Sequence, residues 1–193
     1  MVTADQSVTT SSFYRFLALS MRYPDAQWMT ADYFDTLLTV LAQLGGDTEE
    51  SEIRTVLDDS QPSQLLEDLQ VEYTRLFINS FPHVIAPPFA SIYIDQTLQS
   101  TFTEQTHAFY KQKNYTVTDG SVPPDHLVTE LEFLSLLAEK DDTAGEEAFL
   151  QGFFRPWFQQ YHKRISSVAC HPFYKVVTQL IDFFTKEDEE DGI

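Results

Sequence analysis

The sequence is poor in cysteine and glycine, and each shortage excludes a class of protein. Cys170 is the only cysteine in 193 residues, so the chain can form neither an internal disulfide nor a cluster of thiolate metal ligands. The 6 glycines form no phosphate-cradling loop. Residues 1–8 lack the basic and apolar regions of a signal peptide, and no apolar run approaches the roughly 18 residues of a membrane span. We therefore expect a cytoplasmic protein that is not stably inserted in a membrane.

Basic residues are also scarce, because 12 lysines and arginines stand against 30 aspartates and glutamates. The resulting net charge of −18 gives a surface that repels nucleic acids and anionic lipids and attracts cationic partners. The aromatic residues are not interleaved with basic ones, as they are in proteins that bind nucleic acids. This acidic composition predicts no nucleic-acid partner and permits a cationic peptide.

Hydrophobic residues make up 42% of the chain, enough for one domain with a full core. They recur every three or four positions, which is typical of amphipathic helices. Residues 91–94 are β-branched and aromatic, but they are too few and too isolated for a sheet, so we expect an extended segment or the entry to a helix. We predict an all-α fold, a single globular multi-helix domain over residues 1–193, with helices at about 11–22, 31–44, 62–80, 97–112, 125–140 and 143–168, and one that begins at His171.

Local signals predict where several helices begin, bend or end. Gly45 should stop the second helix, and Asp47 with Glu50 resembles a capping box for a short third one. Pro156 should kink the long helix that contains it. Residues 114–124 are polar and turn-rich, which predicts a hinge between two helical halves. Because a hinge that opens lets two protomers exchange halves, we expect either a monomer or a domain-swapped homodimer.

The helix at 62–80 is followed by a connector that helix formation alone does not require. Its apolar residues form one stripe, which by spacing alone indicates core packing: Leu66, Leu69, Tyr73, Leu76 and Phe77. Pro87 and Pro88 fix φ and remove two backbone donors, so the connector should be extended. A stiff apolar segment beside aromatic side chains is also a good receptor for a short peptide, since little entropy is lost on binding.

Asp125 and His126 stand where the predicted helix 125–140 begins. Asp125 can be explained as an N-cap or first-turn carboxylate of this helix, and His126 as a partly buried histidine at the surface. His126 and Glu130 are four residues apart and share one helix face. A charged rim beside an apolar wall is therefore an alternative for these residues.

The sharpest enzyme-like signal is the spacing Glu104-x-x-His107. Di-iron bundles need two such motifs and two further glutamates that face the core, whereas the chain contains one copy. Both residues lie off the apolar stripe that begins with Leu98, so they should face solvent. We expect no catalytic residue, no metal site and no cofactor. The alternative is a small helical metal-binding protein or enzyme that uses Glu104/His107 or His126/Glu130.

Three motifs resemble those of one known family. They are Tyr73-Thr-Arg-Leu76-Phe77, then Pro87-Pro88-Phe89-Ala-Ser91-Ile-Tyr93, and later Pro124-Asp125-His126-Leu127 followed by Glu130-Leu131-Glu-Phe133. The sequence is similar, over most of its length, to the TorD/DmsD family of redox-enzyme maturation chaperones. Members of this family often carry tryptophan at the positions of Tyr73 and Phe89. The smaller rings here could change which signal peptide the chain accepts.

The resemblance implies an all-helical cytoplasmic chaperone, not an enzyme. It would bind the twin-arginine signal peptide, and the apo form, of a molybdopterin-containing reductase of the dimethyl sulfoxide/trimethylamine N-oxide reductase type, and delay export until the cofactor is inserted. The molybdenum cofactor insertion machinery is a further expected partner. The implied peptide-binding residues, taken with their neighbours in the motifs, are Tyr73, Leu76, Phe77, Pro87, Pro88, Phe89, Ser91, Tyr93, Asp125, His126 and Glu130. Asp125 would attract the leader's arginines and His126 would orient the peptide.

Overall fold

Every regular element in the computed structural model is a helix, within the described residues 4–79, 83–117 and 122–186 and, for side chains, from residue 10 onward. The all-α prediction is therefore confirmed. Across these ranges the one strand-like contact is an isolated bridge between Phe89 and His126, and no helix is long and apolar enough to cross a membrane. The helices are α1 (Ala4–Ser20), α2 (Ala31–Gln43), α3 (Asp47–Asp59), α4 (Pro62–Tyr73), α5 (Ala90–Ile94), α6 (Thr101–Gln112), α7 (Leu127–Glu139), α8 (Thr143–Phe149), α9 (Arg155–Val168) and α10 (Pro172–Thr185), with two π-helices, η1 (Thr74–Ile78) and η2 (Leu150–Phe154).

The chain forms two compact units, each built from separate stretches of sequence. Unit 1 contains Met1–Arg22, Pro88–Arg164 and Thr178–Ile193, and unit 2 contains Tyr23–Pro87 and Ile165–Val177. Helices α9 and α10 therefore each contribute residues to both units. The predicted hinge at 114–124 belongs to unit 1 and lies partly outside the described residues, so the hinge and the single-domain organisation stay predictions.

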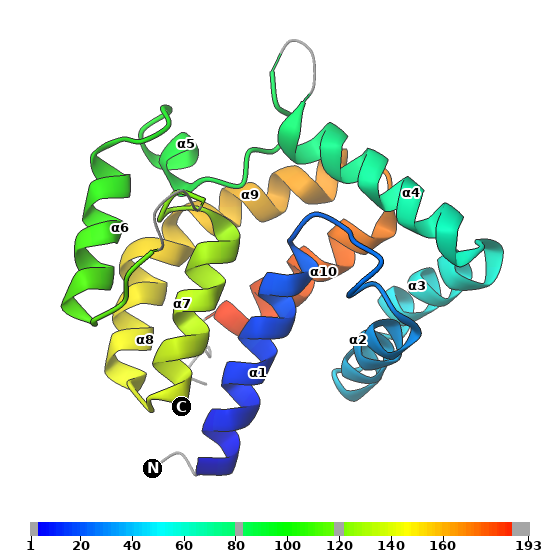
Figure 1. Cartoon of the computed structure of the whole chain (residues 1–193), viewed down its shortest axis with the longest axis horizontal. Coiled ribbons are helices and arrows are strands. Elements are labelled where there is room, and N and C mark those ends of the chain that lie inside the picture. The colour runs from blue at the N-terminus through cyan, green and yellow to red at the C-terminus, as the bar shows by residue number, and fades with distance from the viewer. Residues whose placement is uncertain (1–3, 80–82, 118–121, 187–193) are drawn as a thin grey trace, which may run out of the picture. The chain divides into compact units, whose positions relative to one another are not determined.

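Helix α7 lies in the interior of unit 1. The predicted core residues Leu127, Leu131 and Leu134 are fully buried, and so are polar side chains on other faces of the same helix. A helix enclosed on nearly every side belongs to the inside of a core and does not merely cover it. Helix α1 runs alongside α7 (Figure 1). This burial sets the surroundings of the polar residues that begin α7.

The long helix predicted at 143–168 is interrupted by η2. This π-helix inserts one extra residue into the helical turn, an arrangement that bends helices and is common at functional sites. Pro156 follows η2 as the second residue of α9, and it has no backbone N–H to donate there. Two features that can bend a helix, η2 and Pro156, are therefore adjacent in this segment.

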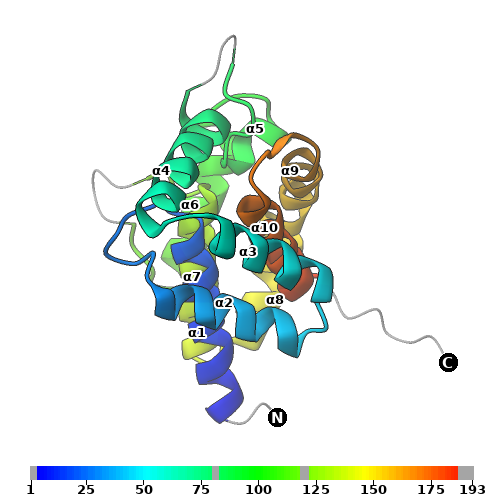
Figure 2. The same cartoon turned by 90° about the vertical axis from the view of Figure 1, so that its right-hand side faces the viewer.

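In unit 2, α2 ends as predicted and α3 begins differently. Gly45 has a left-handed φ of 70°, and the next residue's N–H donates to the carbonyl oxygen of Leu41 at 2.9 Å, which closes a Schellman motif. The predicted capping box is wrong: Asp47 is the first residue of α3, and its N-cap is Gly46, which has no side chain to accept a hydrogen bond. Figure 2 shows α2 and α3 as neighbouring helices.

The helix predicted at 97–112 begins later than expected. Gln96 and Gln99 adopt left-handed φ angles of 58° and 53°, which no continuous α-helix accommodates. Ser100 is the N-cap of α6, and its Oγ accepts a hydrogen bond from the N–H of Phe102 at 3.2 Å. Leu98 is consequently 52% exposed, so its predicted place in the core is wrong. Tyr110, which the pattern missed, is fully buried instead.

Candidate functional site

The first motif spans the junction between α4 and η1 in unit 2. Tyr73, Leu76 and Phe77 are all buried, so the core packing that their spacing indicates is confirmed. The ring of Phe77 lies edge-on to Tyr73, with 4.9 Å between ring centroids, and 5.4 Å from Tyr174. The exposed Tyr23 packs edge-on against Tyr73 at 5.4 Å. Burial raises the pKa of Tyr73 to about 12, so its hydroxyl stays neutral.

The predicted stripe of this helix differs from the observed one near its start. Leu65 is buried, whereas Leu66 is only half-buried. Towards the end, η1 adds a residue to the turn and keeps both Leu76 and Phe77 on the inner face. The N–H of Ala86 donates to the carbonyl oxygen of Leu76 at 2.8 Å, which fixes the start of the connector to η1.

A second feature of unit 2, which the sequence analysis missed, is the buried carboxylate of Glu72. Its Oε1 accepts hydrogen bonds from the N–H groups of Cys170 at 2.6 Å and His171 at 3.3 Å, and Arg75 donates to both of its oxygens. Burial opposes ionisation, but these donors and the charge of Arg75 outweigh it, so the pKa of Glu72 lies below its usual range. Glu72 therefore holds the loop between α9 and α10 against α4. The i, i+3 spacing of Glu72 and Arg75 was the available signal.

In unit 1, the second and third motifs lie against each other. The N–H of Leu127 donates to the carbonyl oxygen of Pro88 at 3.0 Å, and the N–H of Ala90 donates to that of Asp125 at 2.9 Å. The rings of Phe89 and His126 meet edge to face at 4.9 Å. We refer to these contacts between residues 88–91 and 125–127 as the Phe89–His126 pairing. The connector is thus extended at Phe89, as predicted, and enters the short helix α5 at Ala90.

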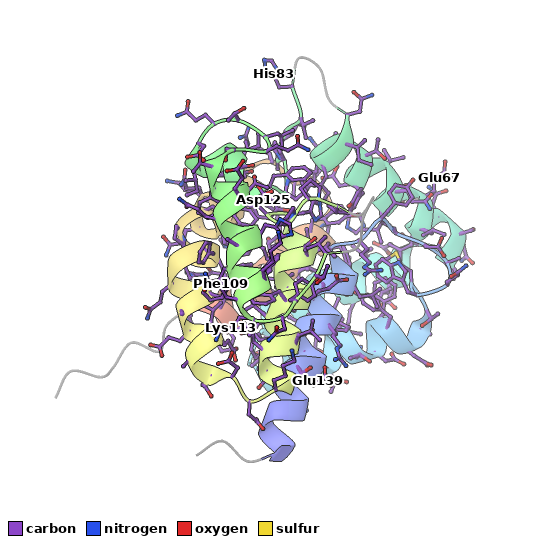
Figure 3. All side chains as sticks on the ribbon, turned by 60° about the vertical axis from the view of Figure 1, so that its left-hand side comes forward. Glu67, His83, Phe109, Lys113, Asp125 and Glu139 are labelled. Carbon is purple, nitrogen blue, oxygen red and sulfur yellow. The ribbon has the colours of Figure 1, made fainter. Side chains whose placement is uncertain are left out.

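Asp125 is fully buried within the Phe89–His126 pairing (Figure 3). Its Oδ2 accepts a hydrogen bond from the N–H of Ser91 at 2.9 Å, in the first turn of α5. Its Oδ1 and the hydroxyl of Ser91 are buried without a hydrogen-bond partner among the described residues. The alternative location on a charged rim is therefore wrong for Asp125. The reason is that the carboxylate satisfies a backbone donor of α5 instead of facing solvent.

His126, and not Asp125, is the N-cap of α7. Its Nδ1 accepts a hydrogen bond from the N–H of Val128 at 3.1 Å, which requires an unprotonated Nδ1. Burial lowers the pKa of His126 to about 4, so the neutral imidazole with its proton on Nε2 is the form at neutral pH. The N-cap interpretation of Asp125 is thus wrong, and a partly exposed surface position for His126 is wrong as well.

Glu130 is also enclosed and not on a rim. Its Oε2 accepts a hydrogen bond from Nε1 of Trp157 at 2.9 Å, which links α7 to α9. Its Oε1 is buried without a partner among the described residues. Burial, reinforced by the nearby Asp125, raises the pKa of Glu130 well above its usual value and so favours the neutral acid. Tyr93 packs on the same tryptophan at 5.7 Å between ring centroids.

The alternative metal or enzyme site rests on the pairs Glu104/His107 and His126/Glu130. Glu104 is exposed and His107 half-buried on α6, the helix on which Figure 3 labels Phe109. Throughout the part of the chain that the structure describes, no three or more His, Cys, Asp and Glu residues are arranged to hold a metal ion. His126 and Glu130 are each engaged in the structural contacts given above.

Comparisons with known proteins place these motifs in a family. The sequence model of the family described as "Nitrate reductase delta subunit" matches residues 47–163, which is more than half of the chain and includes every predicted peptide-binding residue. The chain belongs to this family. The Chaperone protein TorD of Shewanella pealeana is 24% identical over 163 residues, covering 77% of this chain and 73% of that protein. The Chaperone protein TorD of Actinobacillus pleuropneumoniae is 23% identical over 181 residues, covering 91% of this chain and 90% of that protein.

A solved structure supports the same family at the level of the fold. The crystal structure of a candidate redox enzyme maturation protein from Archaeoglobus fulgidus superposes with a TM-score of 0.63 and 25% sequence identity, over 92% of this chain and 94% of that chain. The resemblance found in the motifs is therefore confirmed. The chain is a member of the TorD family of redox enzyme maturation chaperones.

Proposed function

We propose that this TorD-family chain acts in the cytoplasm and binds the twin-arginine signal peptide of a molybdopterin-containing reductase of the dimethyl sulfoxide/trimethylamine N-oxide reductase type. The apo form of the catalytic subunit is the proposed client, and export waits until its cofactor has been inserted. The chain itself carries out no chemistry. The molybdenum cofactor insertion machinery is a further proposed partner.

The observation that carries this proposal is the Phe89–His126 pairing. Two of the three motifs of the family resemblance, far apart in the sequence, form one local structure through three hydrogen bonds and one contact between rings. Phe89 is only half-buried there, so part of its ring is accessible to an apolar side chain of a peptide. Pro87 and Tyr93, on either side of Phe89 in the sequence, are also half-buried.

Most of the other proposed contacts are buried and would need the pairing to open. We propose that a leader peptide first contacts the accessible part of Phe89. The segment at 88–91 then separates from Asp125, which loses the hydrogen bond from Ser91. An arginine guanidinium can replace that donor and can also engage the Oδ1 of Asp125, which has no partner among the described residues in the closed form. A bidentate pair of this kind distinguishes arginine from lysine.

Tyr73, Leu76 and Phe77 contribute differently under this proposal. They are buried in unit 2, so they contact a peptide only if η1 opens. The π-helix η1 ends this helical segment, and π-helical turns are frequent at functional sites. We propose that η1 is the part of unit 2 that rearranges when the client binds.

The test is hydrogen exchange of the full chain with and without a synthetic leader peptide of the client reductase. The expected result is faster exchange of the Ala90, Ser91 and Leu127 amides when the peptide is bound, because these donors leave their acceptors. Phe89→Ala should weaken peptide binding by about 1–3 kcal/mol, as loss of a central apolar contact does. Leu98→Ala, at an exposed apolar residue of the same unit, is the matched control and should bind like the parent. Unchanged exchange at these amides with full peptide binding would contradict the proposed opening.

A further inference from the structure

Helices α2, α3 and α4 of unit 2 are labelled in Figure 2, and residues from them line a pocket of about 220 Å³ that nothing described so far uses. Phe34 from α2, Leu57 from α3 and Leu65 and Leu66 from α4 contribute its apolar walls. None of the proposed leader-binding residues lines it. A cavity of about 150 Å³ with similar walls holds a benzene ring, so this pocket has room for one aromatic or branched aliphatic side chain.

The floor of the pocket is formed by buried residues, and its walls by residues that are partly accessible. Phe34 and Leu65 are buried, and Phe34 lies 6.3 Å from the ring of Phe173, so the floor belongs to the core of unit 2. Leu57 and Leu66 are half-buried, and both line the pocket. This explains why Leu66 departs from its predicted place in the core. An inserted side chain would complete apolar contacts that these two leucines lack.

The surface around the pocket is strongly acidic. Helix α2 carries two acidic residues, α3 six and α4 two besides the buried Glu72, against a single arginine in the three helices. That arginine, Arg54, is paired with Glu50 at 2.7 Å. Asp35 lines the pocket itself, and the exposed Asp58 directly follows Leu57 in the chain. The apolar opening is therefore set in a negative field with little basic charge to offset it.

We propose that this pocket is a docking site for a basic peptide segment of a partner protein. One aromatic or branched side chain of the segment enters between α2 and α4, and flanking lysines or arginines lie against Asp35 and Asp58. Charge complementarity selects this occupant, because a second copy of the chain brings the same net charge of −18 and is repelled. The site is separate from the leader site, so a client can engage the two with different segments.

The test uses methyl NMR of the full chain and three capped heptapeptides. The probe has a central phenylalanine between two runs of three lysines. In one comparison peptide serine replaces the phenylalanine, and in the other glutamate replaces the lysines. The methyl signals of Leu57, Leu65 and Leu66 should shift with the probe and with neither comparison peptide. Shifts confined to residues of the leader site, equal shifts with the glutamate peptide, or dimerisation that covers the pocket would each overturn the proposal.

Variants separate this proposal from leader binding. Leu57→Gln should weaken probe binding by about tenfold, as the loss of an apolar anchor contact does. The matched control Leu98→Gln, also at an accessible leucine, should leave it unchanged. If Leu57→Gln does not fold, the double change Asp35→Asn and Asp58→Asn at two exposed positions should weaken binding and reduce its salt dependence. Phe89→Ala should weaken leader binding and leave the probe unaffected. If a folded Phe89→Ala chain binds neither the leader nor the probe, the two sites are not separate and the proposal is overturned.

Discussion

Glu130→Gln should make the stability of the chain less sensitive to rising pH. Glu130 is fully buried, and burial raises its pKa well above the ordinary value of 4.5, so the folded chain holds its proton where the unfolded chain has released it. For an acid whose pKa is raised by folding, the stabilisation is complete below the unfolded pKa. It is lost as pH rises towards the folded pKa. The loss amounts to at most about 1.4 kcal/mol per pH unit.

Glutamine keeps the size of the side chain and an oxygen that can accept the hydrogen bond from Nε1 of Trp157, but it cannot ionise. Urea unfolding of the parent and the variant, measured from pH 4.5 to pH 8, gives the free energy of unfolding of each. The free energy of unfolding of the variant minus that of the parent should be smallest at pH 4.5. This difference should grow with pH by up to about 1.4 kcal/mol per unit. His126 acts with the opposite sign. Burial lowers its pKa to about 4, so it destabilises the fold as pH falls from 6.5, but it does so equally in both proteins.

One outcome would refute the prediction, and one control assigns the effect to position 130. A difference between parent and variant that stays constant with pH would refute a buried, neutral Glu130. The exposed control Leu98→Gln should give a pH profile parallel to that of the parent, which shows that the changed slope belongs to position 130.

The remaining predictions concern packing, steering and assembly. Leu76→Ala should lower the free energy of unfolding by about 2–5 kcal/mol in urea titrations, whereas Leu98→Ala should change it by less than about 0.5 kcal/mol. In stopped-flow measurements, added salt should slow association of a leader peptide, because the chain carries −18, and change dissociation less. Asp125→Asn should instead speed dissociation, and an unchanged dissociation rate would remove Asp125 from the site. If residues 114–124 open as a hinge, size-exclusion chromatography should detect a dimer at high concentration.

The sequence predicted the helices well because amphipathic periodicity reflects burial directly. Leu127, Leu131 and Leu134 lie on a stripe that the structure buries, and Gly45 ends α2 by the left-handed turn that glycine favours. The prediction that Leu98 lies in the core is wrong for a local reason. Gln96 and Gln99, on either side of it, have left-handed φ angles, and the pattern of apolar residues gives no sign of such angles.

The interior polar residues could not be predicted in the same way. A helical wheel assigns one face to the core, but α7 is enclosed on nearly all sides, so a position off the apolar stripe is still buried. Asp125 and Glu130 therefore looked like rim residues. Their partners, Ser91 and Trp157, are distant in sequence and only the folded chain brings them close. The π-helices are equally invisible, because one extra residue in a turn changes hydrogen bonding and not composition.

The most direct test of the central claim is calorimetric titration of the full chain with the leader peptide of a dimethyl sulfoxide/trimethylamine N-oxide type reductase from the same organism. A second titration uses the same peptide with its two arginines replaced by glutamine. The account predicts saturable binding of the natural leader and a loss of about 1.5–3 kcal/mol for each charge-assisted contact removed in the second peptide. Equal affinity for the two peptides, or no binding of the natural leader to the folded chain, would contradict it.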